Sequence, residues 1–249
     1  GTRATEPPGP HPPMPGCDRL RPPLFEIGLK GYVYGRQALE LARAADRLSR
    51  DLGVTVILDP QLVDLPAIAA ETEHLLVFAQ HMDPVMVGRG AGAVLPEALK
   101  AAGAHGTVLN HSERPVPFDD LARAIRRADD LGLLTLVCAD SPEEAGVIAQ
   151  FAPTMILVEP PALAGPNPSP ARANRALIAR SHELVKRVNP DIIVFNRAGI
   201  RTPRDVADII RAGAEATGVT SAIVCAPDPI RQMERMLVAL KNAWKETHP

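Results

Sequence analysis

The feature that most constrains the fold is an alternation of short apolar runs with longer amphipathic stretches, repeated from residue 24 to near the C-terminus. The apolar runs are aliphatic and β-branched along most of their length, which is typical of strands buried on both faces of a parallel sheet. They span residues 24–30, 54–59, 75–80, 106–110, 133–139, 154–159, 191–196 and 221–226. The alternation predicts eight parallel strands with helical crossovers between them.

Amphipathic segments at residues 35–53, 118–132, 141–152 and 202–214 are the clearest predicted helices. Ser141 and Thr202 are suitable N-caps and each precedes a proline, whereas Gly53 and Gly132 stand where helices should end. The pattern predicts an α/β fold, a single-domain (β/α)8 barrel over residues 24–249. A doubly wound open sheet is the alternative, but no G-x-G-x-x-G segment follows any of the strands.

The first 23 residues differ in kind from the rest of the chain. They contain eight prolines and little apolar periodicity, so we expect a disordered, flexible arm preceding the barrel domain. The net charge of −2 argues against nucleic acid as a partner, because binding phosphates requires a basic surface. No apolar run approaches the length of a membrane span, so we expect no membrane partner.

Three scattered cysteines, Cys17, Cys138 and Cys225, form neither a C-x-x-C pair nor a disulfide framework. This pattern fits a reducing compartment, and the N-terminus lacks the apolar region of a signal peptide. We therefore expect a cytoplasmic protein.

Polar residues stand at most of the predicted strand ends, where barrel enzymes carry their active sites. These residues are Lys30, Gln80, His81, Asn110, His111, Glu159, Asn196, Arg197 and Ser221. A lysine, a histidine and a carboxylate around one pocket suit the removal of a proton next to a carbonyl group, with the carboxylate as base and a neutral imidazole as hydrogen-bond donor. The two histidines lack the spacing and the cysteine partners of a zinc site, so no metal is expected.

Four of these segments carry a family resemblance: LKGY (29–32), AQHMDP (79–84), LNHSER (109–114) and VEPPALAG (158–165). With them, the chain resembles the triosephosphate isomerase family, most closely its compact archaeal type, from Phe25 to the last helix. The resemblance implies a TIM barrel that moves a proton through an enediolate, needs no cofactor and assembles as a homodimer or homotetramer.

The resemblance also implies roles for individual residues. Glu159 would be the catalytic base, His111 the electrophile and Lys30 the cationic anchor. Three residues would support them: Glu113, Gln80 and Asn110. Residues 162–170 would form a lid over the site.

The chain departs from the family mainly where the substrate phosphate would be held. Gly28 replaces an asparagine, Pro166 lies in the lid tip, Arg197 replaces a glycine after the seventh strand, and Ala222 replaces another after the eighth. Ala91 replaces a threonine in the loop that usually forms the subunit interface. The expected substrate-binding residues are therefore Gly165, Arg197, Gly199, Ser221 and Ala222. An arginine could bind a phosphate, phosphonate or carboxylate bidentately in place of lost backbone N–H groups.

These departures favour a divergent member with an altered phosphate site, an aldose–ketose isomerase acting on another small, anionic hydroxy-carbonyl compound. One alternative is a true triosephosphate isomerase with an unusual phosphate site. Another is a non-catalytic barrel that binds a ligand such as a sugar phosphate or nucleotide.

Overall fold

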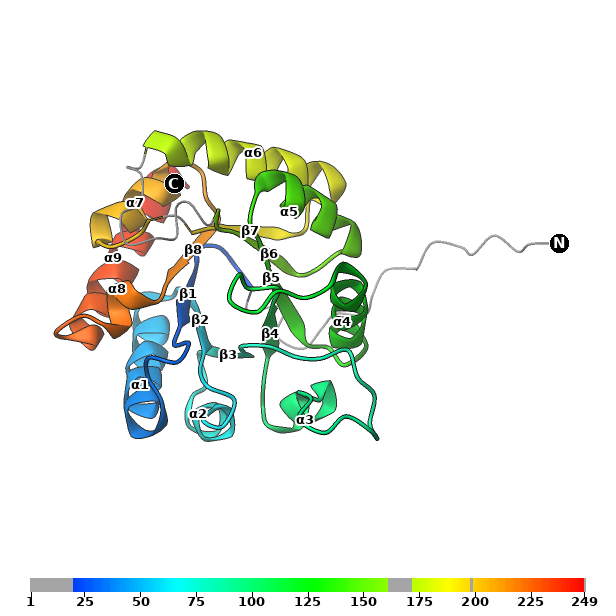
Figure 1. Ribbon diagram of the computed structural model, residues 1–249. Helices are drawn as coiled ribbons and strands as arrows, with labels where there is room; N and C mark the ends of the chain where they lie inside the picture. The colour runs from blue at the N-terminus through cyan, green and yellow to red at the C-terminus, as the bar shows by residue number, and fades with distance from the viewer. Residues whose placement is uncertain (1–19, 161–171, 198, 249) are drawn as a thin grey trace.

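The computed structural model describes residues 20–160, 172–197 and 199–248, and within them eight parallel strands close into a barrel (Figure 1). Each strand pairs in parallel with the next, and β8 pairs with β1. The strands are β1 (Leu24–Gly28), β2 (Thr55–Asp59), β3 (Leu76–Ala79), β4 (Gly106–Leu109), β5 (Leu134–Ala139), β6 (Met155–Val158), β7 (Ile193–Asn196) and β8 (Ala216–Val219). The predicted (β/α)8 barrel is confirmed.

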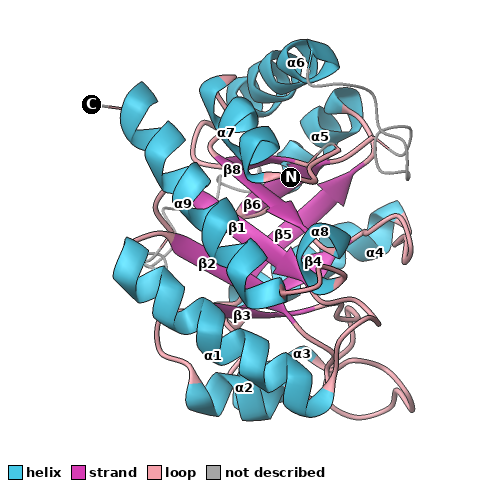
Figure 2. Ribbon diagram, turned by 90° about the vertical axis from the view of Figure 1, so that its left-hand side faces the viewer, coloured by secondary structure: helices cyan, strands magenta, loops and turns pink. Residues whose placement is uncertain are grey.

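Helices surround the barrel on its outer side (Figures 1 and 2). They are α1 (Gly35–Leu52), α2 (Leu65–Glu71), α3 (Pro96–Ala101), α4 (Phe118–Asp130), α5 (Pro142–Ile148), α6 (Arg172–Val188), α7 (Pro203–Arg211), α8 (Ser221–Val224) and α9 (Pro229–Thr247). The last helix, α9, lies between α1 and α7 and packs on both (Figure 2). Among the described helices, none has both the length and the apolar character needed to cross a membrane.

The predicted eighth strand at residues 221–226 is wrong. Residues 221–224 form the short helix α8, and the strand lies earlier, at Ala216–Val219. A short apolar run cannot be assigned to helix or strand by periodicity alone. The strand segment ATGV is not predicted by this pattern because it contains a glycine and only one branched aliphatic residue.

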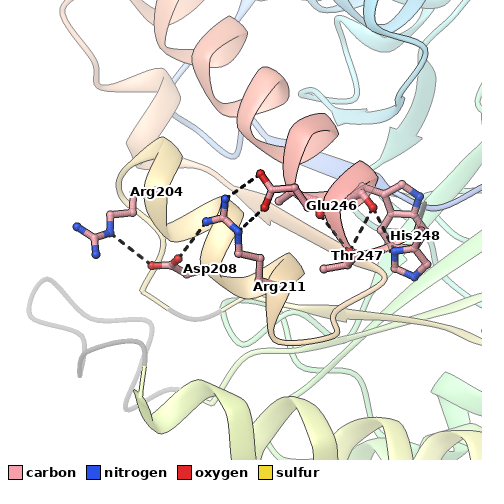
Figure 3. Close-up of polar contacts among 8 residues, drawn as sticks. Arg204, Asp208, Arg211, Glu246, Thr247 and His248 are labelled. Atoms are coloured by element: carbon pink, nitrogen blue, oxygen red, sulfur yellow. Dashed lines mark hydrogen bonds and ion pairs between the residues drawn. The ribbon is translucent and has the colours of Figure 1, made fainter.

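The predicted helix caps at Ser141 and Thr202 are both present. The Ser141 Oγ accepts a hydrogen bond from the Glu144 N–H, and Thr202 forms a reciprocal capping box with Asp205. At the outer surface, Arg211 of α7 pairs with Glu246 of α9, with Nε–Oε2 2.8 Å and Nη2–Oε1 3.2 Å (Figure 3). These contacts connect α7 to α9 on the outside of the barrel.

Two apolar layers hold the barrel together, because alternate strand residues point inward and outward. The outward layer packs against the helices, and the inward layer fills the barrel axis. The inward side chains include Leu24, Ile57, Phe78, Leu136, Leu157 and Phe195. Leu20 packs against this inner layer, whereas residues 1–19 of the expected arm lie outside the described residues. The inner apolar layer does not extend to the carboxyl ends of the strands, where polar side chains are found instead.

Candidate active site

A cavity of about 540 Å³ opens at the carboxyl ends of the strands. Its apolar floor consists of Val108, Leu136, Cys138 and Leu157, which point inward from β4, β5 and β6. Its polar lining comes from Glu26, Lys30, Asp59, Gln61, Gln80, His81, His111, Glu113, Arg114 and Arg197. The fold therefore gathers Lys30 and His111, predicted from separate strand ends, around one cavity.

His111 follows β4 and is held in one tautomer by its own loop. Its Nδ1 accepts a hydrogen bond from the Glu113 backbone N–H at 3.1 Å, so a neutral ring carries its proton on Nε2. That Nε2 is buried and has no hydrogen-bond partner among the described residues. Burial, together with the positive charges of Lys30 and Arg197, lowers the pKa of His111 to about 4. The imidazole is therefore a neutral donor at ordinary pH.

Lys30 follows β1 in a left-handed backbone conformation, with φ of +46°, which a non-glycine residue rarely adopts. Its Nζ lies 2.7 Å from Glu113 Oε1, and its carbonyl oxygen accepts hydrogen bonds from Gln61 Nε2 at 2.6 Å and Gln80 Nε2 at 3.1 Å. The ammonium holds the pKa of Glu113 below its usual range through this hydrogen bond. These contacts fix the ammonium at the cavity wall despite the strain of the backbone.

Glu159 follows β6, two residues beyond the inward-facing Leu157, and its N–H donates to the Ala139 carbonyl at 3.0 Å. Its side chain is 20% exposed, and its Oε1 lies 3.8 Å from Nε of Arg197. Burial raises the pKa of Glu159 above its usual range, while the Arg197 guanidinium partly opposes the shift. A raised pKa makes this carboxylate a stronger base than an exposed glutamate.

Arg197 is buried inside the barrel mouth rather than exposed on a loop. Its Nη1 lies 3.3 Å from Glu26 Oε2, and its Nη2 donates a hydrogen bond to Thr220 Oγ1. Glu26 and Asp59 are themselves buried, and burial together with the charge of Glu26 raises the pKa of Asp59 well above its usual range. Sequence reasoning missed these two acids and Thr220. The signal was available: an acid at an inward position of an otherwise apolar strand needs a buried partner.

The remaining predicted residues lie around the cavity or beyond it. Asn110, in a left-handed conformation with φ of +57°, donates from Nδ2 to the Cys138 carbonyl at 3.1 Å. Among the described residues, Gly199, Ser221 and Ala222 do not line the cavity, although they follow β7 and β8 at the same end of the barrel. Gly165 and the predicted lid at 162–170 lie outside the described residues.

His111, Lys30 and Arg197 line the cavity, whereas the partly buried Glu159 is not among its lining residues and lies next to Arg197. Such groups can remove a proton from carbon and stabilise the oxyanion that results. In the described part of the chain, no group of three or more His, Cys, Asp or Glu residues is arranged to hold a metal ion. The fold and the cavity at its carboxyl end place this chain in the class of (β/α)8-barrel enzymes.

Comparison with known proteins narrows that class. The model of the family "Triosephosphate isomerase" matches residues 27–224. The proteins named triosephosphate isomerase from Sulfurisphaera tokodaii and Sulfolobus acidocaldarius are 36% and 35% identical over 228 residues, which is 91% of this chain and 97% of each relative. The one from Caldivirga maquilingensis is 36% identical over 211 residues, 84% of this chain and 93% of the relative. The chain belongs to the triosephosphate isomerase family and is an isomerase.

Proposed function

We propose that this chain is a triosephosphate isomerase, which interconverts glyceraldehyde 3-phosphate and dihydroxyacetone phosphate. The relatives above all carry that name over nearly their whole length, and this favours the triose phosphates over another anionic hydroxy-carbonyl substrate. The departures at Gly28, Arg197 and Ala222 then change how the same substrate is held.

In this proposal Glu159 removes the proton from the carbon that bears the hydroxyl group, and the electron pair moves toward the neighbouring carbonyl. The carbonyl oxygen becomes negative, and His111 Nε2–H donates a hydrogen bond to it. A proton then passes between the two oxygens, and Glu159 returns its proton to the former carbonyl carbon. Lys30 stabilises the negative charge of the substrate throughout.

The observation that carries this proposal is the hydrogen bonding of His111. A ring with Nδ1 occupied by a backbone N–H and a buried Nε2 without a partner presents a single donor. Leaving a buried hydrogen-bond donor without a partner costs about 1–3 kcal/mol. The presence of such a donor at a cavity therefore favours a role in binding a ligand. A carbonyl oxygen is the kind of acceptor that would satisfy it.

The test is turnover of glyceraldehyde 3-phosphate in D2O, with deuterium incorporation at the reacting carbon followed by NMR. We expect the wild type to turn over the substrate with exchange and Glu159→Gln to lower kcat by about 10²–10⁴-fold, the usual contribution of a general base. Glu40→Gln, an exposed glutamate on α1, is the matched control and should retain wild-type rates.

Two outcomes would contradict the proposal in different ways. If triose phosphates are inert while a tetrulose phosphate or a small hydroxyketo acid exchanges, the chemistry stands and the substrate is wrong. If no member of that panel exchanges, the chain is a ligand-binding barrel.

We further propose a cytoplasmic homodimer or homotetramer. Met86 and Val87, in the loop after β3, are 65% and 71% exposed, and an interface would cover them. Light scattering coupled to gel filtration tests this assembly, and a monomeric mass would contradict it.

A further inference from the structure

Arg197 is a buried cation inside the barrel mouth, and its side chain is only 9% exposed. Its Nη2 donates a hydrogen bond to Thr220 Oγ1, its Nη1 forms an ion pair with Glu26 Oε2 at 3.3 Å, and Glu159 Oε1 lies 3.8 Å from its Nε. That last distance is too long for a hydrogen bond. Burying a guanidinium is costly, and a buried ion pair is weak support for stability alone, so its place at a cavity calls for a functional explanation.

Gly28, the last residue of β1, lines the cavity near Arg197 without contributing a side chain. A Cβ atom at Gly28 would lie 2.9 Å from both Glu26 Oε1 and Thr220 Oγ1, the same two residues that hold the guanidinium. A larger residue at position 28 would therefore require Glu26 and Thr220 to shift. The side-chain donor on this part of the cavity wall comes from β7, through Arg197, and not from β1.

The guanidinium retains donor capacity toward the cavity. A guanidinium has five N–H groups, and the contacts to Glu26 and Thr220 engage Nη1 and Nη2 without using all of them. Arg197 lines the cavity, so those N–H groups have access to a bound molecule. Its contacts also limit the rotation of the side chain, so the donors are already oriented before a ligand binds.

We propose that Arg197 contacts the substrate directly and binds the oxygen that becomes negative as Glu159 removes the proton. This inference rests on the proposed function. A carbon that gives its proton to Glu159 must touch that carboxylate, and the enediolate oxygens lie one or two bonds further on. A cation 3.8 Å from Glu159 is within reach of them. The alternative is that Arg197 only neutralises Glu26.

The test compares two anions by calorimetry. The carboxylate of 2-phosphoglycolate resembles the enediolate, whereas glycerol 3-phosphate carries the same phosphate and no charge at the reacting carbons. We expect Arg197→Met to weaken 2-phosphoglycolate binding by about 10²–10³-fold, the usual effect of losing one oxyanion donor, and glycerol 3-phosphate binding by less than about tenfold. In turnover, kcat should fall far more than KM changes. Arg204→Met, at an exposed arginine of α7, is the matched control (Figure 3).

Arg197→Met leaves Glu26 buried without its cation and could prevent folding. The double variant Glu26→Gln/Arg197→Met removes both charges, and it should fold and show the same selective loss. Equal weakening of both anions, or no weakening, in the folded variant overturns the inference and leaves a structural role.

The inference and the proposed function fail separately. If the wild type turns over triose phosphates and Arg197→Met keeps the wild-type preference for 2-phosphoglycolate over glycerol 3-phosphate, only the inference is overturned. If the wild type does not turn over triose phosphates but prefers 2-phosphoglycolate to glycerol 3-phosphate, and Arg197→Met removes this preference, only the proposed function is overturned. A wild type that binds neither anion overturns both.

Discussion

At the scale of the residue, the site shifts two groups in opposite directions. Burial raises the pKa of Glu159 and lowers that of His111, because in each case it disfavours the charged form. The result is a carboxylate with increased affinity for a proton beside an imidazole that stays neutral. His111 lines the cavity and Glu159 lies next to the cavity residue Arg197, and such divergent pKa shifts around one site are typical of acid–base catalysis.

The first prediction concerns the protonation of His111. With its pKa lowered to about 4, the ring should remain neutral at pH 5, where an ordinary histidine is largely protonated. Nitrogen-15 shifts of the imidazole, assigned by comparison with His111→Gln, would show one protonated Nε2 and one bare Nδ1. A ring that becomes protonated near pH 6.5 would contradict this prediction.

The second prediction concerns Glu26, whose negative charge contributes to the raised pKa of Glu159. In Glu26→Gln that contribution is lost and Arg197 has one acidic neighbour fewer, with Glu159 and Asp59 remaining, so the pKa of Glu159 should fall. The acid limb of kcat/KM against pH should therefore move to lower pH, whereas Glu40→Gln should leave it in place. An acid limb that moves to higher pH would show that Glu26 does not act on the base in this way.

Lys30, His111 and Glu159 could be predicted from the sequence because each directly follows an apolar run, where a polar residue is conspicuous. Glu26 and Asp59 could not be found by that rule. Glu26 lies in the middle of β1 and Asp59 is the last residue of β2, so neither follows its strand. Their role depends on Arg197, which is far away in sequence, and only the closure of the barrel brings the three together.

At the scale of the element, β8 shows why one strand was misplaced. The sequence of β8 fits the neighbouring strand β1 and does not follow the general preference of strands for apolar residues. Gly218 pairs in register with Glu26 of β1 and faces the Glu26 side chain. This contact explains the glycine in ATGV. The residues around Gly218 do not predict the contact, because Glu26 is far away in the sequence. The strand–helix alternation sufficed for the other seven strands because each is apolar over most of its length.

The third prediction tests this contact. In Gly218→Ala the new Cβ would lie 2.7 Å from the Glu26 carbonyl oxygen and closer still to its carboxylate. We expect the free energy of unfolding to fall by about 1–3 kcal/mol, as for other overpacked core positions. Gly31→Ala is the control, because nothing lies within 4 Å of its added Cβ. Equal denaturant midpoints for the two variants would contradict the close approach of β8 to β1.

At the scale of the whole molecule, the barrel interior divides into two zones. Its floor is apolar and contributes stability, whereas its carboxyl end buries Glu26, Asp59 and Arg197, which cost stability unless they compensate one another. The raised pKa of Asp59 shows incomplete compensation, since one cation faces several acids. These buried charges therefore lower the stability of the chain at the end of the barrel where the cavity forms, which is common in active sites.

This imbalance makes the stability of the whole chain depend on pH, which is the fourth prediction. The folded chain holds a proton on Asp59 at pH values where the unfolded chain has released it. Wherever the folded state binds more protons, the free energy of unfolding decreases as pH rises. The loss should begin near the ordinary aspartate pKa of about 4 and end once the pH passes the raised pKa of folded Asp59.

Asp59→Asn isolates this effect because an amide keeps the shape of the protonated acid and has no proton to release. Urea unfolding from pH 4 to pH 8 should show Asp59→Asn gaining stability relative to the wild type as pH rises, then a constant difference. Asp191→Asn, at an exposed site before β7, should follow the wild type throughout. Parallel curves for Asp59→Asn and the wild type would mean that Asp59 ionises alike in both states. The barrel mouth would then hold an additional negative charge, and Arg197 would have to balance it together with Glu26.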